Sequence, residues 1–212
     1  MSMEKYLQIG KINLKHNILP HLLVTAAILF LSPLVLGVSN LEAPDTAKVL
    51  EMYVALTGII LLTPVFLPEQ NKDLRDLVYS KYVKASSVYL VRIVEAVIAM
   101  GVFLGIYMWM LDNNNCQMDL IKYFGGTLAE MLFLGGIGIL CYGLFDNLVI
   151  GYMVPIFYYI VAMGSGDRYL KMLYPFSMAR GSYEEKIYLL IAGVVMITAG
   201  VALRSRRQSA GQ

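Results

Sequence analysis

Six apolar runs of about twenty residues, joined by short polar links, dominate the sequence. A helix rises about 1.5 Å per residue, so a run of this length crosses the roughly 30 Å hydrocarbon layer of a bilayer. Lipid offers the backbone no hydrogen-bond partner, so a span must be a helix or part of a closed barrel. The runs are continuous rather than alternating, and they therefore predict helices. The predicted spans cover about 21–38, 49–67, 90–111, 121–145, 148–163 and 187–203.

The composition agrees with a membrane protein. Of the 212 residues, 58% are hydrophobic and 15% are charged, and the mean hydropathy is +0.64. An ordinary soluble domain carries about 25% charged residues. The predicted fold class is therefore an all-α membrane protein, with one transmembrane domain over residues 1–212.

The distribution of positive charge predicts the orientation. Of the 17 Lys and Arg residues, 11 lie at the end of the spans that carries both termini, and 6 lie at the other end. Lys and Arg near span ends resist translocation. We therefore expect a multi-pass protein of the cell (plasma) membrane with both termini in the cytoplasm.

Two segments outside the spans have unusual composition. Residues 3–18 mix lysines with apolar residues, which predicts a helix lying in the inner interface, with a loose tail as the alternative. The external segment 164–186 is too apolar for open water and is interrupted by Pro175. Non-helical backbone at membrane depth must be covered by protein or line a cavity, so we expect a pair of short re-entrant helices.

Ionisable residues inside the spans are candidates for function. Glu130 lies well inside an apolar run, where a carboxylate is costly and marks a functional position unless it is a neutral or hydrogen-bonded structural group. Arg92 and Glu95 are three residues apart and can pair on one helix face. Glu51 lies at the outer end of its span, where we expect its carboxylate to reach water.

The third span and its external link carry two weaker signals. Gly101 and Gly105 form a G-x-x-x-G pair, a spacing that permits close helix approach. The link 112–119 that follows contains Cys116 and is predicted to be external.

The longest polar stretch with helical character lies between the second and third spans. Within this cytoplasmic loop, 68–89, the apolar residues Leu74, Leu77, Val78 and Tyr82 fall on one helix face. Such an apolar stripe requires a surface on which to dock. Lipid headgroups, the chain's own helices and a separate protein all remain candidates.

Several kinds of chemistry have no motif here. The chain has no G-x-x-x-x-G-K-[ST] phosphate loop, no H-E-x-x-H and no C-x-x-C. The basic residues follow the predicted topology and form no nucleic-acid motif. We therefore expect no catalytic residue, no metal ligand, no cofactor in this chain and no nucleic-acid partner.

The six-span layout, the loop LPEQ…LRDLVYSKY and the external YPFSMA before the last span together resemble the permease subunits of ATP-binding-cassette exporters. The most similar group is the type-2 exporters whose ATPase is a separate chain. The resemblance implies a dimer of identical or different permeases, with ATP and Mg on two partner ATPases. It also implies that a coupling helix at about 72–82 docks in a groove of the ATPase. The residues implied in this contact are Leu74, Arg75, Asp76, Leu77 and Val78.

The functional expectation is a membrane permease that exports a peptide, an antibiotic or a lipid-like substrate and performs no covalent chemistry. One alternative is a proton-coupled secondary transporter that uses Glu130. Another is a membrane regulatory subunit that transports nothing. The substrate, the direction of transport and the identity of the second permease remain open.

Overall fold

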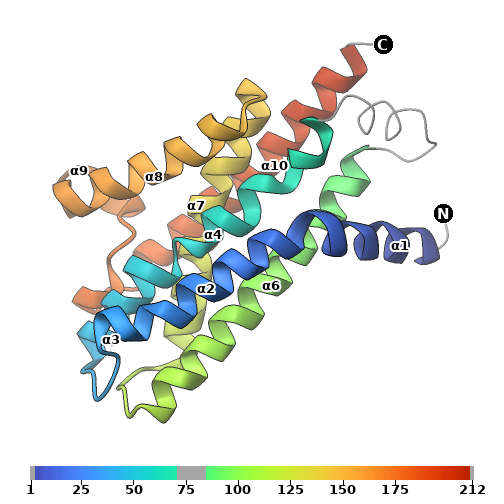
Figure 1. Cartoon of the computed structure of the whole chain (residues 1–212). Helices are drawn as coiled ribbons and strands as arrows, with labels where there is room; N and C mark the ends of the chain where they lie inside the picture. The colour runs from blue at the N-terminus through green and yellow to red at the C-terminus, as the bar shows by residue number, and fades with distance from the viewer. Residues whose placement is uncertain (1–2, 71–84, 211–212) are drawn as a thin grey trace.

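The computed structural model describes residues 3–70 and 85–210 (Figure 1). Within these ranges every regular element is helical, which confirms the all-α prediction. Among the described residues, five stretches are long and apolar enough to cross a membrane, and the predicted span at 148–163 corresponds to a shorter apolar helix. The five long stretches are Gln8–Leu36, Ala43–Gln70, Ser86–Asn113, Leu120–Phe145 and Glu184–Arg206.

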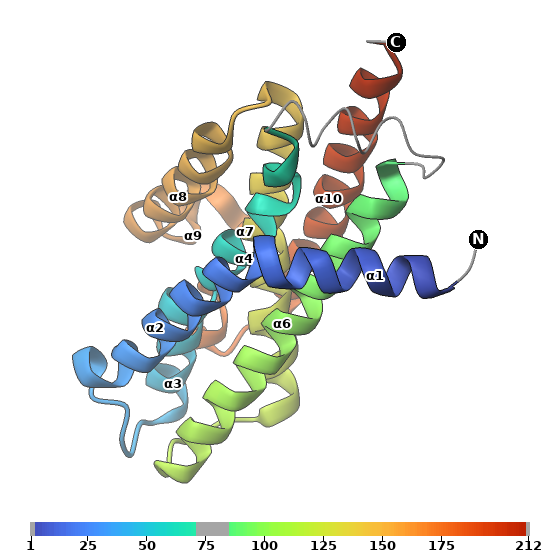
Figure 2. The same ribbon diagram turned by 45° about the vertical axis from the view of Figure 1, so that its right-hand side comes forward.

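The first span is preceded by a helix that turns away from its axis. Helix α1 (Met3–Asn13) passes through one wide π-helical turn, η1 (Leu14–Ile18), into α2 (Leu19–Leu36). Figure 2 shows the bend between α1 and α2. The helix predicted over residues 3–18 is thus present. Helix α2 ends at Gly37, whose φ of 63° is readily adopted by a residue without Cβ.

The second span is built from four short helical pieces. Thr57 donates its hydroxyl to the carbonyl of Val54 at 2.6 Å, and Pro68 lies inside the last piece. Both features compete with regular helical hydrogen bonding. The pieces are α3 (Ala43–Val49), η2 (Leu50–Val54), α4 (Thr57–Leu62) and η3 (Thr63–Gln70).

The remaining spans are regular helices, and two of them begin at a residue whose side chain caps the helix. Asp119 caps α7 by accepting a hydrogen bond from the backbone N–H of Lys122. A further hydrogen bond from the side chain of Lys122 holds the pKa of Asp119 below its usual value. Asn147 caps α8 by accepting from the backbone of Val149 at 2.8 Å. These caps satisfy backbone groups that a helix start leaves open. The helices are α6 (Ala85–Asn113), α7 (Leu120–Phe145), α8 (Leu148–Ser165) and α10 (Glu184–Ala210).

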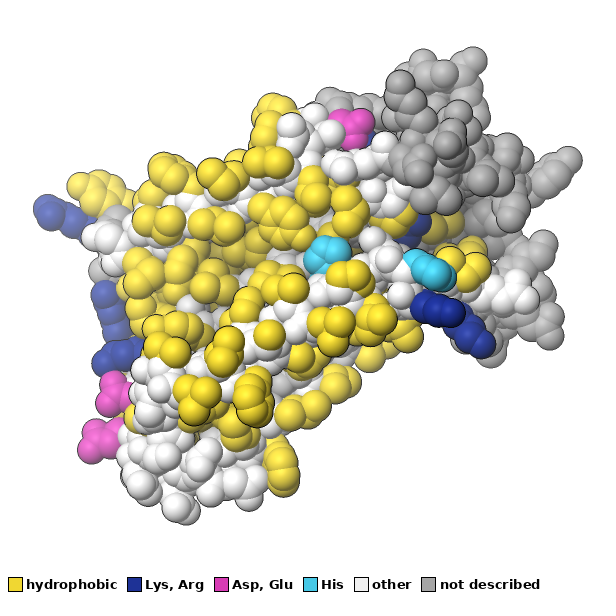
Figure 3. Space-filling view, viewed as in Figure 1, with side chains coloured by type: hydrophobic (Ala, Val, Ile, Leu, Met, Phe, Trp, Pro, Cys, Tyr) yellow, Lys and Arg dark blue, Asp and Glu magenta, His cyan; other side chains and the backbone are white. Residues whose placement is uncertain are grey.

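The helices lie side by side, with both termini at one end, which we call the terminal end (Figures 1 and 2). We call the opposite end the far end. The second and fourth spans are mostly buried, whereas the first, third and last are mostly exposed. The second, fourth and last spans all run from the far end to the terminal end. Hydrophobic side chains cover the middle of the face in Figure 3, with charged residues towards the two ends, as expected for a membrane protein.

The segment between α8 and α10 forms a cap on the far end. Its residues Tyr174, Phe176 and Met178 are buried although they belong to no long helix. The short helices of this segment pack against α3 and α10. Contact with protein therefore accounts for the apolar residues of the second half of the segment, whereas Tyr169, Met172 and Leu173 in its first half are exposed. The short helices are α9 (Asp167–Leu170), η4 (Lys171–Leu173) and η5 (Met178–Arg180).

Candidate functional site

Two clusters of mostly buried polar and charged residues lie in the helix bundle, one towards each end. The Glu51 cluster, near the far end, contains Glu51, Glu130 and Lys186. The Glu69 cluster, near the terminal end, has as its members Glu69, Tyr89, Arg92, Asp146 and Arg204. Buried charges are costly unless they are paired, so these clusters are the first candidates for functional positions.

Lys186 is the centre of the Glu51 cluster. Its Nζ lies 2.8 Å from Oε1 of Glu51 and 2.9 Å from Oε2 of Glu130, and it also donates to the carbonyl oxygen of Pro175. Glu51 and Glu130 are fully buried, and Lys186 is buried as well. One ammonium group therefore joins η2, α7, α10 and the cap.

Glu51 also binds the cap directly. Its Oε1 accepts a 2.7 Å hydrogen bond from the backbone N–H of Met178, and its Oε2 accepts one of 3.2 Å from Ala179. The prediction that the Glu51 carboxylate reaches water is wrong, because the cap folds over it. Gly126 permits this arrangement, since a Cβ there would clash with the sulfur of Met178.

The Glu69 cluster joins the two helices on either side of residues 71–84. Tyr89 donates a 2.5 Å hydrogen bond to Oε2 of Glu69. Arg92 Nη1 donates to the carbonyl of Val65 at 2.9 Å and lies 3.4 Å from Oε1 of Glu69. Since Val65 and Glu69 precede the segment 71–84 while Tyr89 and Arg92 follow it, both of its flanks are held together.

Arg204 extends the Glu69 cluster to the last span. Its Nε lies 3.6 Å from Oε2 of Glu69, and its Nη1 forms an ion pair with Asp146 in the turn between α7 and α8. Its guanidinium carbon is 5.9 Å from the ring centre of Phe66 and 6.0 Å from that of Tyr142. At these distances both aromatic rings can stabilise the cation.

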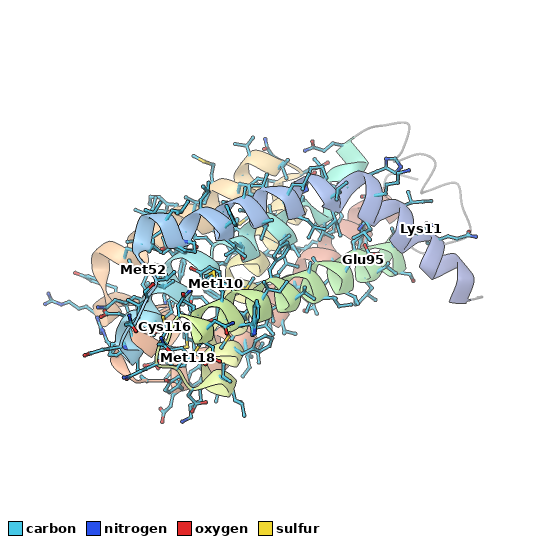
Figure 4. The ribbon with its side chains drawn as sticks, turned by 60° about the horizontal axis from the view of Figure 1, so that its bottom comes forward. Lys11, Met52, Glu95, Met110, Cys116 and Met118 are labelled. Carbon is cyan, nitrogen blue, oxygen red and sulfur yellow. The ribbon has the colours of Figure 1, made fainter. Side chains whose placement is uncertain are left out.

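The three predicted polar positions lie in different surroundings. Glu130 belongs to the Glu51 cluster and Arg92 to the Glu69 cluster, near opposite ends of the bundle. Glu95, labelled on α6 in Figure 4, accepts a 2.7 Å hydrogen bond from Nδ2 of Asn13 at the end of α1. Arg92 and Glu95 thus each bind a partner on another helix rather than each other.

The predicted ATPase-coupling residues lie outside the described part of the chain, and their role stays a prediction. The two described flanks, η3 and α6, approach the terminal end (Figures 1 and 2). The coupling residues concerned are Leu74, Arg75, Asp76, Leu77 and Val78.

Sequence reasoning missed the partners in both clusters. Lys186 and Arg204 were counted only as charges that indicate topology. Glu69 was read as part of a polar loop. The signal that could have found these partners is a carboxylate on one predicted span and a Lys or Arg at a comparable depth on another. Across the two described ranges, no group of three or more His, Cys, Asp or Glu residues has the arrangement of a metal site.

No protein-family model, curated protein or solved structure matches this chain. The function is therefore inferred from the residues and their geometry.

Proposed function

We propose that the chain is the membrane-spanning permease subunit of an ATP-binding-cassette exporter whose ATPase is a separate protein. The observation that supports this proposal is the Glu69 cluster. It holds together the two flanks of residues 71–84, the segment proposed to contact the ATPase, and links them to the last span through Arg204.

The contacts of the Glu69 cluster are suited to transmit movement from residues 71–84 to the spans. A displacement of residues 71–84 acts on η3 and α6 at once, because Glu69 on one flank binds Tyr89 and Arg92 on the other. Through Arg204 and Asp146, the same displacement reaches α10 and the turn between α7 and α8. ATP binding on the partner would then shift the population between inward-facing and outward-facing arrangements through differential contacts with this segment.

In this proposal the functional unit contains two permeases, identical or different, and two ATPases. ATP and Mg bind to the ATPases, and the chain itself supplies no catalytic residue. The exposed apolar faces of α2, α6, α8 and α10 are available to lipid and to the second permease. The proposed cargo is a peptide, an antibiotic or a lipid-like molecule.

A proton-coupled secondary transporter is the second candidate. Glu130 favours it, because this carboxylate is fully buried in a polar cluster and, within the part of the chain that the structure describes, one of its oxygens has no hydrogen-bond partner. Transport that needs a pH gradient and no ATP would select this candidate. A membrane regulatory subunit would show no flux under either condition.

The decisive experiment compares Leu77→Asp with Arg75→Ala in a chain co-expressed with a candidate ATPase of the exporter class. Burial of a Leu side chain stabilises a contact by about 1.5–3 kcal/mol, and a buried unpaired charge costs more. An exposed ion pair contributes only about 0–1 kcal/mol. We therefore expect Leu77→Asp to abolish co-purification and ATP-driven flux into inverted vesicles, and Arg75→Ala to retain both.

Equal amounts of each variant in the membrane provide the control, since neither substitution lies in an apolar run. If Leu77→Asp retains the ATPase and normal ATP-driven flux, the coupling assignment is wrong.

A further inference from the structure

Every N–H of the Lys186 ammonium group is used. An ammonium group has three donors. The acceptors here are Oε1 of Glu51, Oε2 of Glu130 and the carbonyl oxygen of Pro175. Lys186 therefore has no donor left for the second oxygen of Glu130.

Glu51 is fully supplied with hydrogen-bond donors. It accepts from Lys186, from the N–H of Met178 at 2.7 Å and from the N–H of Ala179 at 3.2 Å. Three donors on two oxygens are the surroundings of an ionised carboxylate. Glu51 is thus the carboxylate that balances the charge of Lys186.

Glu130 is supplied differently. Its Oε2 accepts from Lys186, but its Oε1 is buried without a hydrogen-bond partner among the described residues. Two phenols of α8 lie within electrostatic range, yet Tyr158 donates to the carbonyl of Leu173 and Tyr159 to that of Met52. A bare carboxylate oxygen would remain in a site that water does not reach.

The other titratable groups around the cluster do not supply a positive charge to Glu130. Tyr123 of α7, which lies within electrostatic range of Glu51, donates its hydroxyl to the carbonyl of Ala43. Arg180 of η5 holds its guanidinium 5.0 Å from the ring centre of Tyr174. With both carboxyl groups ionised, the three-residue cluster carries a net charge of −1 in a buried position.

We propose that the Glu51 cluster is a proton-binding site and that the proton resides on Oε1 of Glu130. The proton comes from water at the far end and converts the carboxylate into a neutral carboxylic acid, which brings the cluster to zero net charge. Glu51 and Lys186 remain ionised and hold the cap through Met178, Ala179 and Pro175.

The site links the cap to pH. When the cap is closed, Glu130 is buried and keeps its proton; when the cap lifts, Glu130 meets water and releases it. The closed form thus binds one more proton than the open or unfolded form. Above the pH at which a water-exposed carboxyl ionises and below the pH at which the buried Glu130 itself loses its proton, each unit of rising pH then shifts the equilibrium about tenfold towards opening. This inference does not depend on an ATPase partner.

The first test measures thermal unfolding of the purified protein across about pH 6 to pH 9, a range in which free carboxylates are already ionised. We expect the stability of the wild type to fall with rising pH. Glu130→Gln should remain folded and lose this dependence, because an amide reproduces the size and neutrality of the carboxylic acid. Glu95→Gln, a matched change in α6, should keep the wild-type slope.

Glu51→Gln separates the two carboxylates, because it removes the charge that balances Lys186. We expect it to be less stable than Glu130→Gln at every pH. If Glu130→Gln keeps the wild-type pH slope, or is as damaging as Glu51→Gln, the proton is not on Glu130 and the proposal is overturned.

The second test reports on the cap itself and does not require unfolding. In a background without native cysteines, Met178→Cys places a thiol on the buried side of the cap, and Gln117→Cys places one at an exposed far-end position. The ratio of their labelling rates removes the direct effect of pH on thiol reactivity. We expect this ratio to rise with pH in the wild-type background and to be constant with Glu130→Gln. A ratio independent of pH in both backgrounds would contradict the link between proton and cap.

Discussion

Gly136 of α7 and Gly193 of α10 lie against each other so closely that a Cβ at Gly136 would be 2.8 Å from the carbonyl oxygen of Gly193. The relationship recurs seven residues later, where a Cβ at Gly143 would be 2.7 Å from the carbonyl oxygen of Gly200. Two parallel helices with matching glycines at a seven-residue interval pack in constant register. This contact joins the buried fourth span to the last span.

Gly136→Ala tests this contact. The added methyl group meets backbone atoms that cannot move aside, and overpacking of this kind costs about 1–3 kcal/mol. We expect a clear decrease in the thermal unfolding temperature of the purified protein. Gly105→Ala is the matched control, because a Cβ at Gly105 meets no atom of the described residues within 4 Å. Equal effects of the two substitutions would show that the α7–α10 contact is not tightly packed.

Tyr89→Phe removes one hydrogen bond from the Glu69 cluster and keeps the ring. The bond is made to a carboxylate, so its loss should cost about 1.5–3 kcal/mol. Tyr107→Phe provides the comparison, because Tyr107 shares a 2.8 Å hydrogen bond with the neutral hydroxyl of Ser32. Neutral hydrogen bonds contribute about 0.5–1.5 kcal/mol. Unfolding measurements should rank Tyr89→Phe as the more damaging change, and the reverse order would show that the Tyr89 hydroxyl does not donate to a charged acceptor.

Arg204→Met distinguishes a buried structural arginine from a charge that only marks topology. The change leaves Glu69 with one fewer cation, and removal of a partner from a buried ion pair costs about 3–5 kcal/mol. Arg206→Ala, at an exposed position two residues later, should change stability by less than about 0.5 kcal/mol. The yield of folded protein and its unfolding temperature measure both effects. A harmless Arg204→Met would remove Arg204 from the proposed transmission path.

The predicted orientation can be tested by thiol labelling in intact cells. Cys116 is a poor reporter, because it is buried and its sulfur faces the carbonyl of Val38 at 3.9 Å. Gln117→Cys and Lys15→Cys are better positions, since both side chains are exposed, at the far end and near the terminal end respectively. With the far end outside, an impermeant reagent should label only the first. Labelling of only the second would reverse the orientation.

The helices themselves could be predicted from the sequence, because run length decides whether a segment spans a bilayer. The predicted spans were too short. The second begins near Ala43 rather than at 49, and the third extends to Asn113 rather than to 111. Their outer turns are less apolar, so hydropathy alone does not detect them. Asp119 and Asn147, which cap the helices that follow them, mark such ends by their side chains.

The partners of the buried charges could not be predicted in the same way. Glu51 was predicted to reach water because it lies near the end of a span, and the sequence alone does not show that the cap covers it. Pairing of Arg92 with Glu95 was suggested by spacing along one helix, yet Glu69 and Asn13 on other helices lie closer in space. Spacing along one chain segment cannot represent contacts that depend on how the helices pack.

The same limit applies to close helix packing. The G-x-x-x-G pair at Gly101 and Gly105 was the visible motif, but no other helix approaches it as closely as α10 approaches α7. The glycines of the α7–α10 contact are instead spaced by seven on two different helices. Comparison of the predicted spans for matching intervals would have found them.

The last helix supplies a cation to both clusters, and it is also the last helix of the bundle to be synthesised. Glu51 and Glu130 are made long before Lys186, and Glu69 is made long before Arg204. Until α10 enters the bundle, Glu51 and Glu130 lack Lys186, and Glu69 has Arg92 as a cationic partner but not Arg204. A chain that stops before α10 therefore leaves Glu51 and Glu130 without the cation of their cluster, so both ends of the bundle depend on the last helix for their full set of ion pairs.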